Sequence, residues 1–408
     1  YNLIVTTAIF PIYYLGTTQE AFGGEMVEFF NMSVKNSVLY SYAISFSFLV
    51  IVFLSPILSG IADYGGLKKQ FMQFFTYLGS LACIGLYFFT GENVEYGIAC
   101  SVTASIGFAG SLVFYNGFLP EVATKDKMDS VSARGFAMGY IGSVILLIIN
   151  LVLYQKYEVF GFENGSSATR FGFILVGVWW LGFAQIAFYY LKDSNSRKTI
   201  TVKILGNGTK ELRKVWLVVK DKKVMKRFLY SFFLFSMGVQ TVMLLAPLFA
   251  DKEIGMGADE MIYIVLILQI LAIGGAFFFA WLSKLRGNGF AISTTLFIWT
   301  FICISGYFMQ DKISFYTLAA FLGFVMGGIQ SISRSTYSKL IPAKAKDTAS
   351  YFSFYDITEK LAIVIGSLSY GFIDQITGSM RYSMVFMSLF FITGFVMLQR
   401  ANLKKNLV

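Results

Sequence analysis

Histidine is absent from this 408-residue chain. Its absence removes the commonest metal ligand, the usual pH switch near neutrality and the Ser-His-Asp type of catalytic triad. The three cysteines, Cys83, Cys100 and Cys303, lie in apolar runs, so neither a disulfide framework nor a zinc site is indicated. The sequence also lacks a phosphate-binding glycine loop and the HExxH and GxSxG motifs. We therefore expect a protein that is not an enzyme and that uses no cofactor and no metal.

Charged residues are scarce as well. They make up 14% of the chain, whereas 56% is hydrophobic, and the mean hydropathy is +0.65. This composition lies far outside that of a soluble globular domain and indicates an integral membrane protein. The net charge of +10 does not indicate a nucleic-acid partner, because most basic residues lie in short loops between apolar runs.

Runs of about 20 apolar residues are long enough to span a bilayer as helices. The expected segments lie at about 1–15, 37–60, 71–89, 96–119, 134–155, 171–191, 228–250, 261–283, 290–309, 313–340, 350–373 and 382–399. We therefore expect an all-α membrane protein with twelve transmembrane helices, arranged as two parallel-repeat halves of six helices each. Because the first segment lacks the basic flank of a signal peptide, we also expect the natural chain to begin upstream of Tyr1.

Loop charges predict the orientation of these helices. Lysine and arginine concentrate in the loops of one membrane side, around 68–69, 125–134, 192–227, 284–286, 339–346 and 400–405. The loops of the opposite side carry few bases and are rich in glutamate. Since basic loops remain in the cytoplasm, we expect both termini there, in a multi-pass protein of the bacterial cytoplasmic (inner) membrane.

The longest loop divides the chain into two halves. The expected parts are an N-terminal six-helix half at 1–191, a basic cytoplasmic linker at 192–227 and a C-terminal six-helix half at 228–408. Within the linker, Leu212, Val215, Trp216 and Val219 recur at helical spacing among lysines and arginines, which indicates an amphipathic helix on the cytoplasmic leaflet. This helix is a tether between the halves or, in the alternative, a regulatory contact.

The fourth and tenth segments end in a similar way. Residues 114–120 read FYNGFLP and residues 335–342 read STYSKLIP, and both contain the spacing Tyr-x-x-x-x-Pro. Parallel duplication of a six-helix unit is a feature of transporters, whose solute site lies near the middle of the membrane between the repeats. The paired motifs therefore favour a transporter.

A charge inside the membrane marks the tenth segment. Arg334 lies about eight residues before Pro342, roughly 12 Å inside the end of the helix. An arginine at membrane depth costs roughly 2.5–3.5 kcal/mol, so it must face protein or water and find a partner. Gln330 and Tyr337 recur on the same helical face. We expect Gln330, Arg334 and Tyr337 to line a solute-binding cavity.

The eleventh segment supplies partners for this arginine. Asp356, Glu359 and Lys360 share a helical face, and Asp356 and Lys360 stand in the favourable i,i+4 order. Because ionisable residues inside a membrane favour a functional site, we expect all three to bind solute. The alternative is a self-neutralised structural cluster, in which Asp356 pairs with Lys360 and Glu359 pairs with Arg334. Three polar residues of other segments complete the expected cavity: Tyr115, Asn116 and Gln240.

The loop after the second segment reads SGIADYGGLKK over residues 59–69. Its glycines allow a tight reversal, and its lysines hold the loop in the cytoplasm. Asp63 can accept hydrogen bonds from the backbone at the start of a neighbouring helix, where the helix dipole favours an anion. The alternative is a simple turn, and the matching loop 281–287 of the second half lacks the acid. The residues of the expected conformational gate are Asp63, Gly65, Gly66, Lys68 and Lys69.

This loop resembles the signature between the second and third helices of the major facilitator superfamily. Four stretches, at 114–123, 134–142, 327–342 and 354–366, resemble one branch of that superfamily. The branch contains bacterial "unknown major facilitator" proteins and the autophagy-related vacuolar amino-acid effluxers. The resemblance spans nearly the whole chain and implies a rocker-switch transporter of twelve helices. Two positions depart from the family pattern, Ser59 where glycine is usual and Glu359 where a small residue is usual.

These observations predict a secondary active transporter that moves a small polar or zwitterionic solute, such as an amino acid, by alternating access. A solute carboxylate would meet Arg334 or Lys360, a solute amino group would meet Asp356 or Glu359, and a proton is the candidate coupling ion. The alternatives are a proton-coupled exporter of amphipathic cations and a non-transporting membrane receptor or accessory protein. The expected partners are the small-molecule solute, protons and the lipid bilayer. We expect a monomer that binds no nucleic acid.

Overall fold

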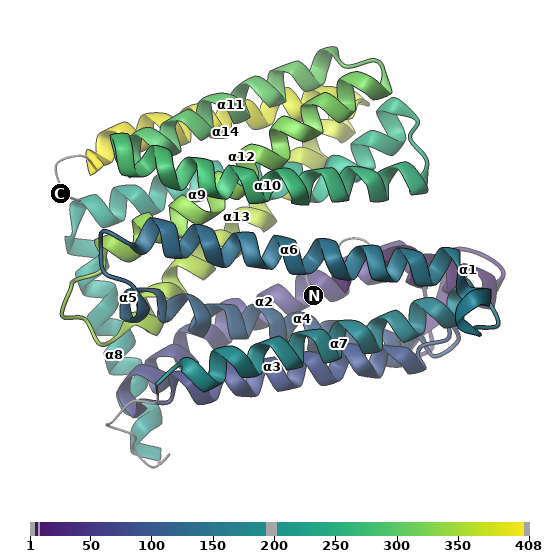
Figure 1. Ribbon diagram of the computed structural model, residues 1–408, viewed down its shortest axis with the longest axis horizontal. Helices are drawn as coiled ribbons and strands as arrows, with labels where there is room; N and C mark the ends of the chain where they lie inside the picture. The colour runs from purple at the N-terminus through teal and green to yellow at the C-terminus, as the bar shows by residue number, and fades with distance from the viewer. Residues whose placement is uncertain (1–4, 7–8, 193–201, 404–408) are drawn as a thin grey trace. The chain divides into compact units, whose positions relative to one another are not determined.

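The computed structural model describes residues 5–6, 9–192 and 202–403. Within these residues, ten helices are long and apolar enough to cross a bilayer. Two further helices complete the twelve predicted ones: α1 (Ile9–Phe22), which is shorter, and α13 (Thr348–Thr377), which carries three charged residues in its middle. The chain is therefore an all-α, multi-pass membrane protein, as its composition predicts (Figure 1).

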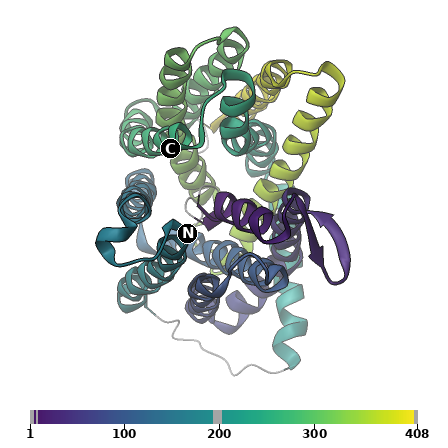
Figure 2. The same cartoon turned by 90° about the vertical axis from the view of Figure 1, so that its right-hand side faces the viewer.

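The chain forms two compact units, and unit 1 comprises Tyr1–Tyr115 and Ser143–Leu212. Its elements are α1, β1 (Met26–Phe29), β2 (Met32–Lys35), α2 (Asn36–Gly65), α3 (Lys68–Gly85), η2 (Leu86–Phe88), most of α4 (Val94–Gly117), the second half of α6 (Met128–Gln155), η3 (Tyr157–Phe160), α7 (Gly165–Tyr190) and the first half of α8 (Val202–Asp221). Strands β1 and β2 form an antiparallel hairpin, purple in Figure 2, that connects α1 to α2. This hairpin corresponds to none of the segments that the sequence predicts.

Aromatic rings fix α1 within unit 1. The ring centroid of Phe10 lies 5.9 Å from that of Phe89 and 5.7 Å from that of Phe173 on α7. Tyr14 stacks on Phe89 at 5.8 Å, and the Tyr13 hydroxyl donates a hydrogen bond to the Phe89 carbonyl at 3.0 Å. Because lipid is as apolar as these rings, helices in a membrane associate through close packing and hydrogen bonds of this kind.

Unit 2 comprises Asn116–Gly142 and Arg213–Val408. Its elements are α5 (Leu119–Val122), the first half of α6, the second half of α8, α9 (Lys223–Ile254), α10 (Ala258–Arg286), α11 (Asn288–Phe308), α12 (Lys312–Leu340), α13 and α14 (Met380–Ala401). One continuous cluster of buried apolar side chains forms the core of this unit. Trp299 of α11 and Phe391 of α14 stack at 5.2 Å in that core.

Helices α10 and α12 pack backbone to backbone. A Cβ atom on Gly323 would lie 2.5 Å from the carbonyl oxygen of Leu268, and a Cβ atom on Gly327 would overlap the carbonyl oxygen of Ala272. Glycine at these two positions, four residues apart, permits an approach that any side chain would block. The contact fixes the rotation of α12, the helix that carries Arg334.

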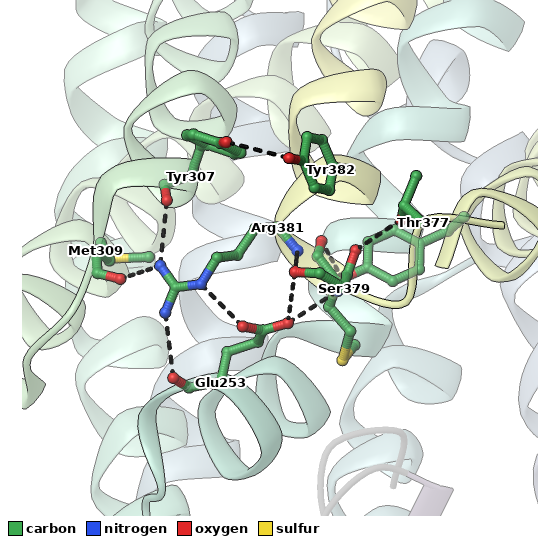
Figure 3. A network of polar contacts seen from close by, with 9 residues as sticks. Glu253, Tyr307, Met309, Thr377, Ser379, Arg381 and Tyr382 are labelled. Atoms are coloured by element: carbon green, nitrogen blue, oxygen red, sulfur yellow. Dashed lines mark hydrogen bonds and ion pairs between the residues drawn. The ribbon is translucent and has the colours of Figure 1, made fainter. Parts of the chain in front are cut away.

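A polar network joins three helix ends of unit 2 (Figure 3). Arg381 at the start of α14 donates from Nε to Glu253 Oε2 at the end of α9, at 2.8 Å. The same guanidinium donates to the carbonyl oxygens of Tyr307 and Met309 at the end of α11. Glu253 in turn accepts a hydrogen bond from the Met380 backbone at 2.9 Å. Since charge-assisted hydrogen bonds are the strong ones, this network holds α9, α11 and α14 together.

The first of the expected segments needs correction. The first segment, predicted at 1–15, is found as α1 and extends to Phe22 within the described residues; residues 1–4 and 7–8 lie outside them. In the added turns the hydroxyls of Thr17 and Thr18 donate to the carbonyls of Tyr13 and Tyr14, which satisfies these polar side chains inside the helix.

The predicted linker helix is present as α8. Its Val215 and Val219 side chains belong to the core of unit 2, and the Trp216 ring lies 5.5 Å from that of Phe354 on α13. The apolar face of the helix therefore packs on protein in this region. Residues 193–201 of the linker and the C-terminal residues 404–408, with their two lysines, lie outside the described chain.

Candidate functional site

Three charged side chains meet near the middle of α13. Lys360 Nζ lies 3.6 Å from Asp356 Oδ1 and 3.5 Å from Glu359 Oε2. Asp356 and Lys360 are four residues apart, so helical geometry places them on one face. From α9, Gln240 Nε2 donates a hydrogen bond to Glu359 Oε1 at 2.9 Å. The structure thus brings together four of the expected site residues within unit 2.

The charges of this α13 cluster do not balance. Two carboxylates share one ammonium group, so the cluster has a surplus of one negative charge. The Asp356 side chain is only 2% exposed, and among the described residues its Oδ2 atom has no hydrogen-bond partner. A buried carboxylate oxygen without a donor is costly. It is therefore suited to accept a proton or an ammonium group.

Arg334 on α12 is directed towards the start of α6. Its Nε donates to Ser132 Oγ at 3.0 Å, its Nη2 donates to the Ser132 carbonyl at 2.9 Å, and its Nη1 donates to Asn116 Oδ1 at 3.2 Å. The guanidinium carbon lies 4.4 Å from the centre of the Phe136 ring, a cation–π contact. The considered pairing of Arg334 with Glu359 is wrong, because Glu359 contacts Lys360 and Gln240 instead.

Ser132, Phe136 and Tyr140 form a stripe along α6, since residues four apart share a helical face. The Ser132 hydroxyl donates to the Ser331 carbonyl at 2.7 Å, and the Tyr140 hydroxyl donates to Gln330 Oε1 at 2.7 Å. This stripe therefore positions the expected site residues of α12.

Two further tyrosines, Tyr337 and Tyr115, belong to the expected cavity. Tyr337 is fully buried; its hydroxyl donates to the Tyr351 carbonyl at 2.7 Å and its ring lies 5.2 Å from that of Tyr355. In this conformation Tyr337 contributes to the core of unit 2. Tyr115 is the last residue of the stretch Tyr1–Tyr115 in unit 1, and its side chain is exposed.

The expected gate loop lies in unit 1 between α2 and α3. Helix α2 ends at Gly65, and Gly66 adopts a φ of 67°, the left-handed cap conformation that favours glycine. The predicted tight reversal is therefore present. Lys69 Nζ donates to the Leu191 carbonyl at 2.9 Å, and Lys68 is buried, while Asp63 lies half-buried on the last turn of α2.

A buried polar network in unit 2 joins the starts of α6 and α11 to the ends of α10 and α12. Asp129 Oδ2 accepts hydrogen bonds from Lys339 Nζ at 2.6 Å and Ser283 Oγ at 2.7 Å, and its Oδ1 accepts from Asn288 Nδ2 at 2.8 Å. Asn288 also contacts Lys339 and Thr336, both at 2.9 Å. Buried polar groups need hydrogen-bond partners, and each member of this network supplies partners to the others.

The family model for "Vacuole effluxer Atg22 like" proteins matches residues 18–408. The chain belongs to this family. It is 29% identical to the MFS-type transporter YxiO of Bacillus subtilis, over 98% of this chain and 90% of that protein. It is 24% identical to autophagy-related protein 22 of Yarrowia lipolytica, over 90% of this chain and 76% of that protein.

Solved structures agree with the family assignment. The chain superimposes on the fucose:proton symporter FucP of Escherichia coli with a TM-score of 0.66, covering 96% of this chain and 94% of that one at 16% identity. The Atg22-like chain therefore has the major facilitator fold of a membrane transporter, as the resemblance implied.

Sequence reasoning missed the Asp129 network of this Atg22-like chain. Its members have no recognisable spacing in the sequence, and the Asp129–Lys339 contact spans 210 positions. One signal was available. Residues 281–287, expected as a loop, form the end of α10 and lack the acid that Asp63 supplies in the first half; Asp129 brings a carboxylate from α6 to Ser283 of this stretch.

Proposed function

We propose that this Atg22-like transporter is a secondary active transporter that moves a small zwitterionic solute of the amino-acid class by alternating access, driven by protons. The observation that carries the proposal is the surplus carboxylate of the α13 cluster, in which Asp356 Oδ2 has no hydrogen-bond partner among the described residues. Ionisable groups inside a membrane mark solute and proton pathways.

The chemistry of the cluster suits an exchange of partners. The ammonium group of the solute binds the carboxylate charge that Lys360 does not neutralise. The solute carboxylate binds Lys360. When Lys360 turns to the solute, Asp356 loses its counter-charge and takes up a proton. Glu359 remains oriented by Gln240. Solute binding and proton binding are thereby coupled at Asp356.

The remaining expected residues have supporting roles in the proposed mechanism. Asn116, Gln330 and Tyr115 supply polar contacts around the solute. Arg334 positions α6 against α12, because its guanidinium already binds Ser132 and Asn116. The loop with Asp63, Gly65, Gly66, Lys68 and Lys69 serves as a gate.

A second candidate function is the proton-coupled export of amphipathic cations. The surplus negative charge of the α13 cluster favours it, since a cation needs only the carboxylates. A receptor that binds a solute without moving it is the third candidate. Transport measurements separate the three.

The test is solute uptake into proteoliposomes that contain the purified full chain. We expect labelled amino acids to accumulate when an imposed pH gradient is present, and to exchange without net accumulation when it is absent. Asp356→Asn should abolish gradient-driven accumulation while exchange survives. Asp126→Asn, in an exposed loop, is the matched control. Accumulation of tetraphenylphosphonium alone would favour the cation exporter, and binding without flux would favour the receptor.

The proposed membrane placement is a monomer in a bacterial cytoplasmic membrane with both termini in the cytoplasm. Single cysteines in a Cys100→Ser background test it, because Cys83 and Cys303 are buried. A cysteine at Lys210 should react only from the cytoplasmic side, and one at Glu25 only from outside. The opposite pattern would reverse the orientation.

A further inference from the structure

A large cavity lies in unit 2 where α6 and α11 begin and α10 and α14 end. Its volume is about 1750 Å³. Pockets for small molecules typically measure about 300–1,000 Å³, so this cavity accommodates a longer ligand. It is separate from the α13 cluster, none of whose charged residues lines it.

The charge of the cavity lining is strongly positive. Five basic and two acidic side chains line it, which leaves a surplus of three positive charges. Lys339 is already paired with Asp129. Three of the other bases, Arg134, Lys284 and Arg286, are exposed and make no ion pair in the part of the chain that the structure describes. These groups are available to an anion.

Aromatic side chains line the deeper part of the cavity. Phe297 lies nine residues after Asn288, about 14 Å along α11, and Phe277 lies a similar distance before Arg286 on α10. Both rings are exposed in the protein, Phe297 to 75%. Trp281 lies between these depths and is exposed to 55%. The cavity thus has a cationic end at the helix ends and an open apolar wall at membrane depth.

We propose that this cavity binds an anionic phospholipid from the leaflet on the basic side of the membrane. The phosphate headgroup contacts Arg134, Lys284 and Arg286, and the acyl chains lie along Phe277 and Phe297. The amphipathic lining requires an amphipathic ligand, and basic pockets between membrane helices bind anionic headgroups. Trp281 sits at the boundary, where tryptophan is enriched in membrane proteins.

The bound lipid would lie beside the Asp129 network. Asp129, Ser283, Asn288 and Lys339 all belong to the wall of the cavity. The same side chains join α6 to α10, α11 and α12. A lipid in this cavity therefore contacts the junction of those four helices.

The experiment uses Trp281 as the probe. The full chain is placed in phosphatidylcholine nanodiscs that contain increasing amounts of dibrominated phosphatidylglycerol, and tryptophan quenching is recorded. We expect saturable quenching that exceeds the quenching by dibrominated phosphatidylcholine. Because the chain has five tryptophans, Trp281→Phe identifies the signal, and the saturable part should disappear in that variant.

Charge variants test the headgroup contacts. The triple variant Arg134→Gln, Lys284→Gln, Arg286→Gln should bind the brominated lipid about 100-fold more weakly, since each basic group near an anionic headgroup contributes about fivefold. The control variant Lys220→Gln, Lys222→Gln, Lys223→Gln removes the same charge outside the cavity and should bind as the wild type does. Equal weakening in both variants would overturn the proposal.

The wild-type protein alone also decides the question, whether or not the triple variant folds. Equal saturable quenching by the two brominated lipids would show that the cavity does not select an anionic headgroup. Displacement of the lipid by millimolar glycerol phosphate or inorganic phosphate would show a site for soluble anions. Either result would overturn the assignment of a phospholipid.

Discussion

Lys339 Nζ lies 2.6 Å from Asp129 Oδ2 and joins the end of α12 to the start of α6. Both side chains are nearly buried, at 11% and 8% exposure. Removing one member of a buried ion pair costs about 3–5 kcal/mol, because the remaining charge loses its partner. We therefore expect Asp129→Asn to lower the melting temperature of the purified protein strongly.

Two variants control for this effect. Asp126→Asn removes an exposed acid three residues earlier and should melt as the wild type does. The double variant Asp129→Asn, Lys339→Met removes both charges and should recover much of the lost stability. A double variant as unstable as the single one would mean that Ser283 and Asn288, not the ion pair, make the network important.

Two glycine-to-alanine changes, one on α12 and one on α10, should change the stability of the protein in opposite directions. Gly327→Ala should destabilise the protein, because the new Cβ overlaps the carbonyl oxygen of Ala272. Gly274→Ala on α10 meets no atom within 4 Å and should stabilise by about 0.5–1 kcal/mol through helix propensity. Thermal unfolding of both variants checks the prediction. A stable Gly327→Ala variant would show that the two helices can separate without cost.

The twelve-helix fold follows from the sequence because each apolar segment has to satisfy its own backbone hydrogen bonds in lipid. Segment length and loop charge then suffice to place most helices. The hairpin of Met26–Phe29 and Met32–Lys35 has no such constraint. It depends on left-handed backbone at Phe30 and Asn31. Asparagine tolerates this conformation but phenylalanine does not favour it, so the turn signal is weak.

The candidate site was only partly predictable. The α13 cluster follows from residues three and four positions apart on a single helix, which sequence spacing specifies directly. The partners of Arg334 cannot be predicted from spacing, because Ser132 lies 202 positions away and no motif marks it. Which acid would meet which base depends on the rotation of each helix. In α12 the backbone contacts at Gly323 and Gly327 contribute to that rotation, and sequence spacing does not reveal them.

Lys360 should be essential to the stability of the α13 cluster. Lys360→Met leaves Asp356 and Glu359 without their counter-charge and should cost about 3–5 kcal/mol, seen as a large fall in melting temperature. Adding Asp356→Asn should restore much of it. Lys35→Met is the matched control, since its ion pair with Glu25 is exposed and contributes less than about 1 kcal/mol. If the single variant melts normally, the cluster is well hydrated.

Asp63 is expected to hold the gate by accepting hydrogen bonds at the start of a neighbouring helix. Asp63→Asn should then shift the balance between inward-open and outward-open forms without unfolding the protein. The measurement is the labelling rate of a cysteine placed at Gln240, in the Cys100→Ser background, from each side of the membrane. Asp221→Asn, an exposed acid at the end of α8, serves as control. Unchanged labelling in Asp63→Asn would leave Asp63 as part of a simple turn.

Arg334 gives the sharpest division between a structural and a solute-binding role. Its three hydrogen bonds to Ser132 and Asn116 and its contact with the Phe136 ring are all lost in Arg334→Ala. Each charge-assisted hydrogen bond contributes about 1.5–3 kcal/mol, so we expect a large fall in melting temperature. Arg334→Lys keeps the charge but lacks the fork that reaches both partners, and it should recover only part of the loss. Ser132→Ala should destabilise less than either change, because the Ser132 carbonyl still accepts from Nη2. The competing outcome is a normal melting temperature in Arg334→Ala together with loss of amino-acid binding. That result would show that Arg334 binds the solute and is not needed for the contact between α6 and α12.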